Sequence, residues 1–287
     1  MHIEDYNTDS RYQATLITSQ RITSEDSKDE VRELTLELLC DDFQFEVGQS
    51  VGLLVPGPHE FGHEFHFRLY TIADTPTQSN NNNPSIKLCV KRCHYIDDYS
   101  GEHFDGIASN YLCDLKPGQN CTLTGPYGLP FEIPTDKNSD ILMIGMGTGI
   151  APFRAFVKHI YQTLGSWQGK VRLYYGAHSG LEMLYMNDER NDFSHYYDEE
   201  TFKAFQAISA RPYWSNIVDF SSVFDEQQEI WKMLNRNNTH VYVAGHEEIR
   251  TSLDHALEKI AGSAEKWKHK KNELEAGRRW TELIYGD

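Results

Sequence analysis

The sequence predicts a two-domain α+β protein, with an antiparallel β-barrel followed by a doubly wound α/β domain built on a parallel sheet. Up to about residue 135, short alternating or apolar runs are separated by turn residues, a pattern typical of a barrel. From about Ser139, short apolar strands alternate with segments of helical periodicity, which indicates a parallel sheet covered on both faces. The length of 287 residues also favours two domains, which we place at residues 1–137 and 138–287.

The first domain contains three runs with strand patterns, at residues 12–18 (YQATLIT), 31–38 (VRELTLEL) and 86–90 (IKLCV). Residues 78–84 (QSNNNNP) are polar and of low complexity, so we expect an exposed hairpin tip there. Pro117-Gly118 and Gly125-Pro126 predict tight turns. A helix is expected near residues 107–112 (IASNYL).

The second domain contains three short apolar strands, at residues 141–145 (ILMIG), 171–176 (VRLYYG) and 240–245 (HVYVAG). Each precedes a segment with helical periodicity, and residues 202–209 (FKAFQAIS) form a further candidate strand. The linker between the domains is expected within residues 134–139 (PTDKNS).

The most informative stretch is residues 145–152 (GMGTGIAP), a glycine-rich turn between a predicted strand and a predicted helix. Glycines let the backbone approach a ligand, and the N–H groups and dipole of a helix start attract negative charge. The spacing differs from the G-x-G-x-x-G fingerprint, and an ordinary strand-to-helix turn is the alternative. Gly176, Ala177 and Gly245 fall at the same edge of the sheet, beyond the strand ends where α/β sheets bind ligands.

Composition excludes several classes of function. The formal charge of −16 argues against binding nucleic acid through a general basic field. The N-terminus lacks an apolar signal core and no segment is long enough to span a bilayer, so we expect a soluble, cytoplasmic protein. The five cysteines form no C-x-x-C pair, which favours reduced thiols. Cys89, Cys93 and His94 could suggest a metal site, but their surroundings have a strand pattern, so no metal is predicted.

The tetrapeptide Arg68, Leu69, Tyr70 and Thr71 follows a polar loop and opens a probable strand. On alternating strand positions Arg68 and Tyr70 share one face. An arginine can fork onto a phosphate, and a tyrosine can lay its ring against an aromatic ligand. Thr71, on the other face, could direct its hydroxyl and N–H toward a ring nitrogen. An exposed arginine beside a packed tyrosine is the alternative.

Further motifs give this tetrapeptide a context. They lie at residues 48–52 (GQSVG), 88–92 (LCVKR), 106–112 (GIASNYL), 116–118 (KPG), 124–128 (TGPYG) and 145–154 (GMGTGIAPFR). In order and spacing the chain resembles the plant-type ferredoxin–NADP(+) reductases, which are two-domain flavoproteins that use FAD. The resemblance extends over most of the sequence and implies an oxidoreductase active in electron transfer.

The resemblance implies a set of FAD contacts. Arg68 would bind the FAD pyrophosphate, Tyr70 would lie against the ribityl chain and isoalloxazine, and Thr71 would lie near flavin N5. Tyr95 matches the tyrosine that stacks on adenine. Two further segments match those beside the diphosphate and adenosine, namely Cys89, Val90 and Lys91, and the helix start at Ile107, Ala108 and Ser109.

The resemblance also implies an NADP(H) site. Thr148 matches the threonine between flavin and nicotinamide, and Ser209 and Arg211 fall where the family binds the 2′-phosphate. That pair is normally adjacent, but here Ala210 separates its members, so NAD(H) remains open. The remaining positions match the pyrophosphate turn or the strand ends flanking the nucleotide, namely Gly147, Gly149, Pro152, Gly176, Ala177 and Gly245.

Catalysis in such proteins depends on orienting the two cofactors rather than on side-chain chemistry. The predicted catalytic residues are Thr71, Thr148 and Tyr285, with Tyr285 stacking on the flavin and moving aside for nicotinamide. Ala244 replaces the family's cysteine near the nicotinamide, and Glu282 lies one residue out of register with its acid. The chain also extends past Tyr285 by Gly286 and Asp287.

The resemblance implies ferredoxin or flavodoxin as the one-electron partner. Because such carriers are acidic, a basic docking face is expected at Lys87, Lys91, Arg92, Lys116 and Lys158. The basic cluster at residues 266–271, with Arg278 and Arg279, is interpreted as a solvated helix face. Two alternatives remain: an NAD(P)H-dependent reductase component of an oxygenase system, and a flavin electron-relay module without nicotinamide turnover.

Overall fold

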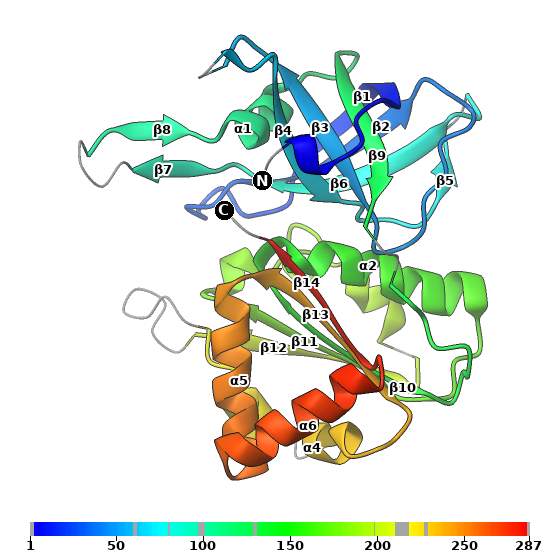
Figure 1. The fold of residues 1–287 in the computed structure, drawn as a ribbon, viewed down its shortest axis with the longest axis vertical. Coiled ribbons are helices and arrows are strands. Elements are labelled where there is room, and N and C mark those ends of the chain that lie inside the picture. The colour runs from blue at the N-terminus through cyan, green and yellow to red at the C-terminus, as the bar shows by residue number, and fades with distance from the viewer. Residues whose placement is uncertain are drawn as a thin grey trace. The chain divides into compact units, whose positions relative to one another are not determined.

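A computed structural model of the chain describes residues 3–59, 62–79, 81–96, 101–128, 131–197, 199–209, 218–226 and 229–285. The chain divides into two compact units, which are coloured from blue to red along the sequence in Figure 1 and are described here one at a time. Unit 1 contains Met1–Phe131 and Arg154–His159, and unit 2 contains Glu132–Phe153 and Ile160–Asp287. The domain boundary proposed at residues 137 and 138 stays a prediction.

Unit 1 is built on a seven-stranded sheet with the order β4-β3-β9-β1-β2-β6-β5, in which all neighbouring strands are antiparallel. An isolated bridge between Ile72 and Leu88 joins the residue after β4 to β6, so the sheet curls toward closure as a barrel. The strands are β1 (Arg11–Arg21), β2 (Val31–Leu38), β3 (Ser50–Pro56), β4 (Phe65–Thr71), β5 (Thr77–Gln78), β6 (Pro84–Lys91) and β9 (Asn120–Tyr127).

Alternating apolar side chains fill the interior of unit 1, because successive strand residues point to opposite faces. Ala14 and Leu16 of β1 pack with Leu34 and Leu36 of β2, and all four are fully buried. A 3-10 turn, η1 (Ile3–Asp5), precedes the barrel. The predicted hairpin tip is confirmed, because β5 pairs with the start of β6 and the loop between them closes through Ser79 N–H and the Asn83 carbonyl at 2.8 Å.

The predicted tight turn at Gly125-Pro126 is wrong, because both residues lie inside β9. Ser50 pairs with Tyr127 and Gly52 pairs with Thr124, so β9 carries one extra residue across this step. Gly125 adopts a φ of +114°, which other residues rarely reach. The Gly-Pro pair therefore forms a β-bulge that bends the strand rather than a turn that ends it.

A two-stranded ribbon and a helix complete unit 1. Strands β7 (His94–Ile96) and β8 (His103–Asp105) pair antiparallel and project from the barrel beside helix α1 (Ile107–Asp114), as Figure 1 shows. The helix confirms the sequence prediction near residues 107–112. It packs through Ala108, Leu112 and Cys113 onto the barrel core.

Unit 2 contains a five-stranded parallel sheet with the order β12-β11-β10-β13-β14. Every residue of β10 and β11 is buried, as expected for central strands covered on both faces. Together with the antiparallel unit 1, this sheet confirms the predicted fold class. The strands are β10 (Asp140–Met146), β11 (Val171–Ala177), β12 (Phe202–Ile208), β13 (Thr239–His246) and β14 (Trp280–Tyr285).

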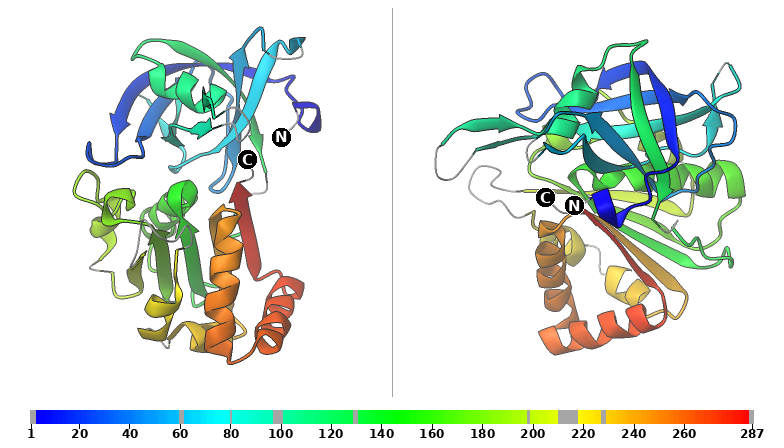
Figure 2. Two further views of the ribbon diagram at one scale, coloured as in Figure 1. Left: turned by 90° about the vertical axis from the view of Figure 1, so that its left-hand side faces the viewer. Right: turned by 45° about the horizontal axis from the view of Figure 1, so that its top comes forward.

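Helices cover both faces of this sheet, as two views in Figure 2 show. One face carries a core in which Leu142 and Ile144 pack with Phe224, Leu253 and Trp267. Phe224, Leu253 and Trp267 come from α3 (Ser221–Glu226), α5 (Glu248–Ala261) and α6 (Ala264–Ala276), and Ile230 of α4 (Glu229–Leu234) joins the same core.

On the opposite face, helix α2 (Ile150–Lys158) directs Phe153 against Gly145, and a π-helical turn, η4 (His159–Leu164), follows it. The helix expected after β11 is absent from the described residues, where short 3-10 turns, η5 (Gly180–Glu182) and η6 (Asp192–Tyr196), take its place. Within the described parts of the chain, no helix combines the length and apolar character needed to cross a bilayer.

Candidate cofactor sites on the two units

Strand β4 presents Arg68 and Tyr70 on one face, as the alternation predicts. Arg68 and Tyr70 pair with Leu53 and Val51 of β3. The side chains of Arg68 and Tyr70 are half-buried. Among the described residues, no hydrogen bond or ion pair of the Arg68 guanidinium is found, so its charge is available to an anion. Burial raises the pKa of the Tyr70 hydroxyl, which keeps it neutral.

Thr71 lies at the end of β4, and its side chain is buried. Its hydroxyl is 3.2 Å from that of Ser50, the residue opposite it on β3. Thr71 is therefore anchored in the barrel by a hydrogen bond that its sequence position did not reveal. Its predicted role near flavin N5 stays a prediction.

Strand β6 carries the predicted trio Cys89, Val90 and Lys91. The side chains of Cys89 and Val90 are buried, whereas Lys91 is exposed and binds Asp29 through a 2.5 Å ion pair. A ligand contact at Cys89 or Val90 would therefore have to use the backbone. Leu69, on β4, pairs with Gly52 and is half-buried.

The start of α1 is fixed to the ribbon by hydrogen bonds. The Ser109 hydroxyl accepts from the Cys93 N–H at 3.1 Å and donates to the Gly106 carbonyl at 3.2 Å. Asn110 donates from Nδ2 to the carbonyls of Cys93 and Gly106, each at 2.9 Å. The first turn of α1 contains no acidic residue, so no carboxylate within the helix compensates its positive dipole end. The first two helical residues differ in burial: Ile107 is exposed and Ala108 is buried.

Tyr95 lies on β7 and is exposed. Its ring stacks on Phe104 of β8, with the ring centroids 5.2 Å apart and an interplanar angle of 17°. The sequence singled out Tyr95 but not Phe104. Phe104 lies nine positions further along the chain, so only the pairing of β7 with β8 shows that the two rings meet.

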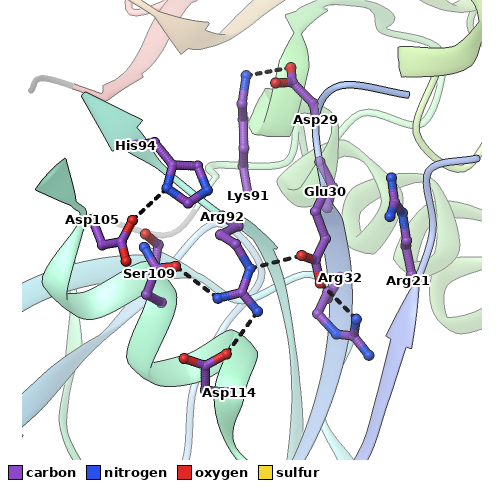
Figure 3. Close-up of polar contacts among 12 residues, drawn as sticks. Arg21, Asp29, Glu30, Arg32, Lys91, Arg92, His94, Asp105, Ser109 and Asp114 are labelled. Atoms are coloured by element: carbon purple, nitrogen blue, oxygen red, sulfur yellow. Dashed lines mark hydrogen bonds and ion pairs between the residues drawn. The ribbon is translucent and has the colours of Figure 1, made fainter. Parts of the chain in front are cut away.

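The predicted basic docking face is largely neutralised by carboxylates. The Arg92 guanidinium lies between Glu30 and Asp114, as Figure 3 shows. It is 2.8 Å from the Glu30 carboxylate and 2.9 Å from that of Asp114, and it donates a third bond of 2.7 Å to Asn110 Oδ1. Lys87 pairs with Glu33 at 3.1 Å. Of the predicted docking residues, four are held in ion pairs within unit 1, namely Lys87, Lys91, Arg92 and Lys158, while Lys116 is exposed.

The buried carboxylate of Asp74 forms ion pairs with more than one basic side chain. Asp74 binds Lys158 at 2.6 Å and Arg154 at 3.2 Å, and Arg154 also donates to the Ala73 carbonyl at 2.7 Å. Burial alone would raise the pKa of Asp74, but the charges of Arg154 and Lys158 outweigh it and lower the pKa. Arg154 closes the glycine-rich motif in the sequence, and in the structure it belongs to unit 1.

In unit 2 the glycine-rich turn is a 3-10 turn, η3 (Gly147–Gly149), which leads directly into α2. Gly147 has a φ of +55°, and its carbonyl accepts a hydrogen bond of 2.9 Å from the Tyr175 hydroxyl. A Cβ on Gly149 would lie 2.1 Å from the Ala244 carbonyl oxygen. The turn therefore packs against β13 at a distance that only glycine permits, and Thr148 at its centre is half-buried.

The other predicted nucleotide residues lie at the same edge of the sheet. Met146 pairs with Gly176 and Gly145 pairs with Ala244, which aligns the carboxyl ends of β11 and β13 with the turn. Pro152 lies in the first turn of α2, Ala177 ends β11, and Gly245 has a φ of +154°. Ser209 follows β12, and its N–H donates to the Ala177 carbonyl at 3.2 Å. Arg211 lies outside the described residues, as do Gly286 and Asp287.

The C-terminal segment forms strand β14 at the edge of the sheet, which the sequence analysis did not predict. The signal was present in the alternation of residues 280–285 (WTELIY). Tyr285 pairs with His246 and is half-buried. Ala244, in the neighbouring strand, is fully buried. The proposed lid role of Tyr285 stays a prediction.

Glu282 is engaged in a network of its own. Its carboxylate accepts from Arg250 Nε at 2.8 Å and from Trp280 Nε1 at 2.7 Å, with Lys271 at 3.7 Å. Burial would raise its pKa, but the hydrogen bonds from Trp280 and Arg250 lower the pKa overall. An acid held in this way is a poor proton donor, which agrees with its displaced register.

Comparison with known proteins gives consistent matches. The family described as the oxidoreductase NAD-binding domain matches residues 143–254. A ferredoxin–NADP reductase of Spirulina sp is 28% identical over 285 residues, covering 96% of this chain and 95% of that relative. The chloroplastic leaf isozyme 1 of Oryza sativa subsp. indica, also named ferredoxin–NADP reductase, is 29% identical over 281 residues, covering 96% and 76%.

Solved structures share the fold. Ferredoxin–NADP(+) reductase from Plasmodium falciparum superposes with a TM-score of 0.72 at 21% identity, over 98% of both chains. The same reductase with 2′P-AMP gives a TM-score of 0.70. The relatives match almost the whole chain, and the glycine-rich turn lies at the carboxyl edge of the parallel sheet. Over almost its whole length the chain is therefore similar to ferredoxin–NADP reductases, and residues 143–254 match the oxidoreductase NAD-binding domain.

Proposed function

We propose that this protein is an FAD-dependent oxidoreductase that exchanges a hydride with NADP(H) and single electrons with ferredoxin or a flavodoxin-like carrier. The observation that carries this proposal is the environment of the Arg68 side chain. Its half-buried guanidinium shares a strand face with Tyr70 and has no anionic partner among the described residues. An unpaired, partly desolvated arginine beside an aromatic ring fits a phosphate joined to a flat heterocycle.

The residues of unit 1 fit FAD in distinct roles. Arg68 would bind the pyrophosphate, and the start of α1, with no acidic residue in its first turn, would add N–H donors and a favourable dipole. Tyr70 would lie against the ring system, and Thr71, fixed by Ser50, would present its backbone near flavin N5. Bound FAD supplies the chemistry, because it accepts a hydride and passes electrons on singly.

The residues of unit 2 fit a nicotinamide dinucleotide. Gly147 and Gly149 leave a turn without side-chain bulk at the start of α2, where a pyrophosphate can approach the backbone. Thr148 would contact the nicotinamide, and Ser209, with Arg211, would bind the 2′-phosphate of NADP(H). Tyr285 would cover the flavin until nicotinamide replaces it. These residues bind and orient the cofactors and exclude water, and no acid–base side chain is needed for the transfer.

The names of the relatives support ferredoxin as the partner. A flavin that passes electrons on singly can reduce such a one-electron carrier. The cations on unit 1 are already paired with acids, so electrostatic steering of an acidic carrier should be modest. We expect the protein to act in the cytoplasm, where its five free cysteines would stay reduced.

The decisive experiment mixes the purified protein anaerobically with NADPH, and separately with NADH, while flavin absorbance is followed. The protein should carry about one FAD per chain, because one set of FAD-contact motifs is present, and NADPH should bleach it within the mixing time. Ferredoxin, flavodoxin and an artificial one-electron dye are then offered as acceptors. Failure to retain flavin, or the absence of bleaching with both nucleotides, would refute the proposal.

One observation keeps a second candidate open. Ala244 stands where the family has a cysteine near the nicotinamide, and its side chain is fully buried in the sheet. A flavin electron relay without nicotinamide turnover would retain FAD but remain oxidised with either nucleotide, so the same experiment separates the two functions. A reductase serving an oxygenase would bleach with NAD(P)H but reduce neither ferredoxin nor flavodoxin.

A further inference from the structure

The β7–β8 ribbon carries two different pairs on its two faces. His94 pairs with Asp105 across the strands on one face, with Nδ1 and Oδ1 2.7 Å apart (Figure 3). One position further along, Tyr95 pairs with Phe104 on the other face, where their rings stack nearly parallel. The strand pairing thus places the two aromatic rings opposite each other, and the His94–Asp105 contact on the other face stabilises the same pairing.

The base of the ribbon is fastened to α1. The Gly106 N–H donates to the Cys93 carbonyl at 2.9 Å, which closes the ribbon where β8 meets the helix. Arg92, just before the ribbon, reaches Asn110 and Asp114 of α1 and Glu30 near the start of β2. A two-stranded ribbon is marginal alone, so these anchors give it the fixed orientation that its sequence would not supply.

The aromatic pair is exposed despite its size. Tyr95 is 57% exposed and Phe104 is 39% exposed, and neither contributes to the barrel core. Apolar side chains that cluster on an exposed surface can mark a ligand-binding site. Phe104 covers one face of Tyr95 and leaves the opposite face available to another flat ring.

We propose that Phe104 is a positioning residue for the adenine half of FAD. It holds the Tyr95 ring in one orientation, so that the adenine stacks on a surface already ordered, and it thereby sets the preference for FAD over FMN. Preorganisation favours binding because the cost of immobilising the tyrosine is met during folding. This inference rests on the proposed flavin function, and it concerns only the adenosine part of the ligand, which FMN lacks.

The test equilibrates the full-length holoprotein with mixtures of FAD and FMN, and then measures the composition and total amount of bound flavin by chromatography. The ratio reports FAD selectivity directly, whereas the total reports general loss of binding. Phe104→Ala should lower the FAD-over-FMN preference about three- to tenfold, the range expected for loss of an aromatic pair. Tyr95→Ala should lower it about tenfold or more, because the base loses its stacking surface.

Matched variants distinguish positioning from mere stability. Phe104→Tyr keeps a ring at the position and should restore the wild-type preference. Ile96→Ala removes an equally exposed apolar side chain from the opposite face of β7 and should change nothing. An unchanged preference in Phe104→Ala, or an equal loss in Ile96→Ala, would overturn the inference while leaving flavin binding intact. A wild-type protein that binds neither flavin would instead refute the proposed function.

Discussion

Gly149 and Ala244 approach each other so closely that a Cβ on the glycine would lie 2.1 Å from the alanine carbonyl oxygen and 2.4 Å from its carbonyl carbon. Both atoms belong to the backbone of β13, so the clash could not be relieved by a side-chain rotation. The glycine-rich turn is thus pressed against the neighbouring strand. This contact explains why the position admits no side chain, independently of any ligand.

Substitution of Gly149 should therefore damage both stability and nucleotide binding. We expect Gly149→Ala to lower the free energy of unfolding by about 1–3 kcal/mol, the usual cost of overpacking, because the turn must move away from β13. Denaturant unfolding and NADP(H) titration would measure the two effects. Gly180→Ala is the control, since its Cβ would meet nothing within 4 Å, and a loss equal to that of Gly149→Ala would contradict the packing argument.

Arg68→Ala should weaken flavin retention without unfolding the barrel. Loss of a charge-assisted hydrogen bond to a phosphate corresponds to about 1.5–3 kcal/mol of binding free energy. The measurement is the dissociation constant of FAD, with thermal unfolding of the apoprotein as a check on the fold. Arg11→Ala removes another positive charge of unit 1, which lies 4.8 Å from the centroid of the Phe65 ring, and should leave retention unchanged. Equal retention in both variants would remove Arg68 from the site.

Tyr285→Ser should increase nicotinamide occupancy at the flavin and reduce discrimination between NADPH and NADH, because a stacked ring would no longer compete with nicotinamide. The ratio of kcat/KM for the two nucleotides measures the discrimination. Leu283→Ala, in the same strand β14, controls for a general weakening of the sheet edge. If Leu283→Ala shifts the ratio as far as Tyr285→Ser does, the tyrosine is not the lid.

The stability of unit 2 should depend on pH through Glu229. Hydrogen bonds from Arg172 lower the pKa of this carboxyl to about 2, and a second partner is Lys170. Because the folded pKa lies below the unfolded one, the stabilisation is fully present above about pH 4.5 and disappears as the pH falls toward 2. Glu229→Gln should cost on the order of 1–3 kcal/mol at pH 7 and progressively less in acid.

Urea unfolding at a series of pH values would check this dependence. Glu275→Gln, at an exposed position of α6, should leave the curve close to that of the wild type. A Glu229→Gln deficit that is as large at pH 3 as at pH 7 would show that the ion pair does not carry the effect.

The sequence was sufficient for the main strands of both units, since alternation in residues 31–38 and the apolar run at 141–145 directly reflect burial. It was also sufficient to predict the glycine-rich turn between β10 and α2 and the placement of Arg68 and Tyr70 on one face of a strand. Gly125-Pro126 misled because a turn dipeptide can also make a bulge, and only the register of β9 against β3 separates these outcomes.

Ion pairs between residues far apart in the chain could not be predicted from the sequence. Glu30 and Arg92 are separated by 62 residues, and Asp74 and Lys158 by 84, so no local pattern relates them. The docking face was predicted from lysines and arginines alone, without the acids that neutralise them. Strand β14 was missed because its six residues follow a helix and were interpreted as a tail around Tyr285.

The unequal exposure of the five cysteines has a practical consequence. Cys89, Cys113 and Cys121 are buried, and burial raises the pKa of the Cys113 thiol to about 11 and that of Cys121 to about 12. Cys93 is exposed and lies at the foot of the ribbon. A maleimide dye should therefore attach preferentially beside Tyr95 and report, by its fluorescence, each arrival and departure of the cofactor.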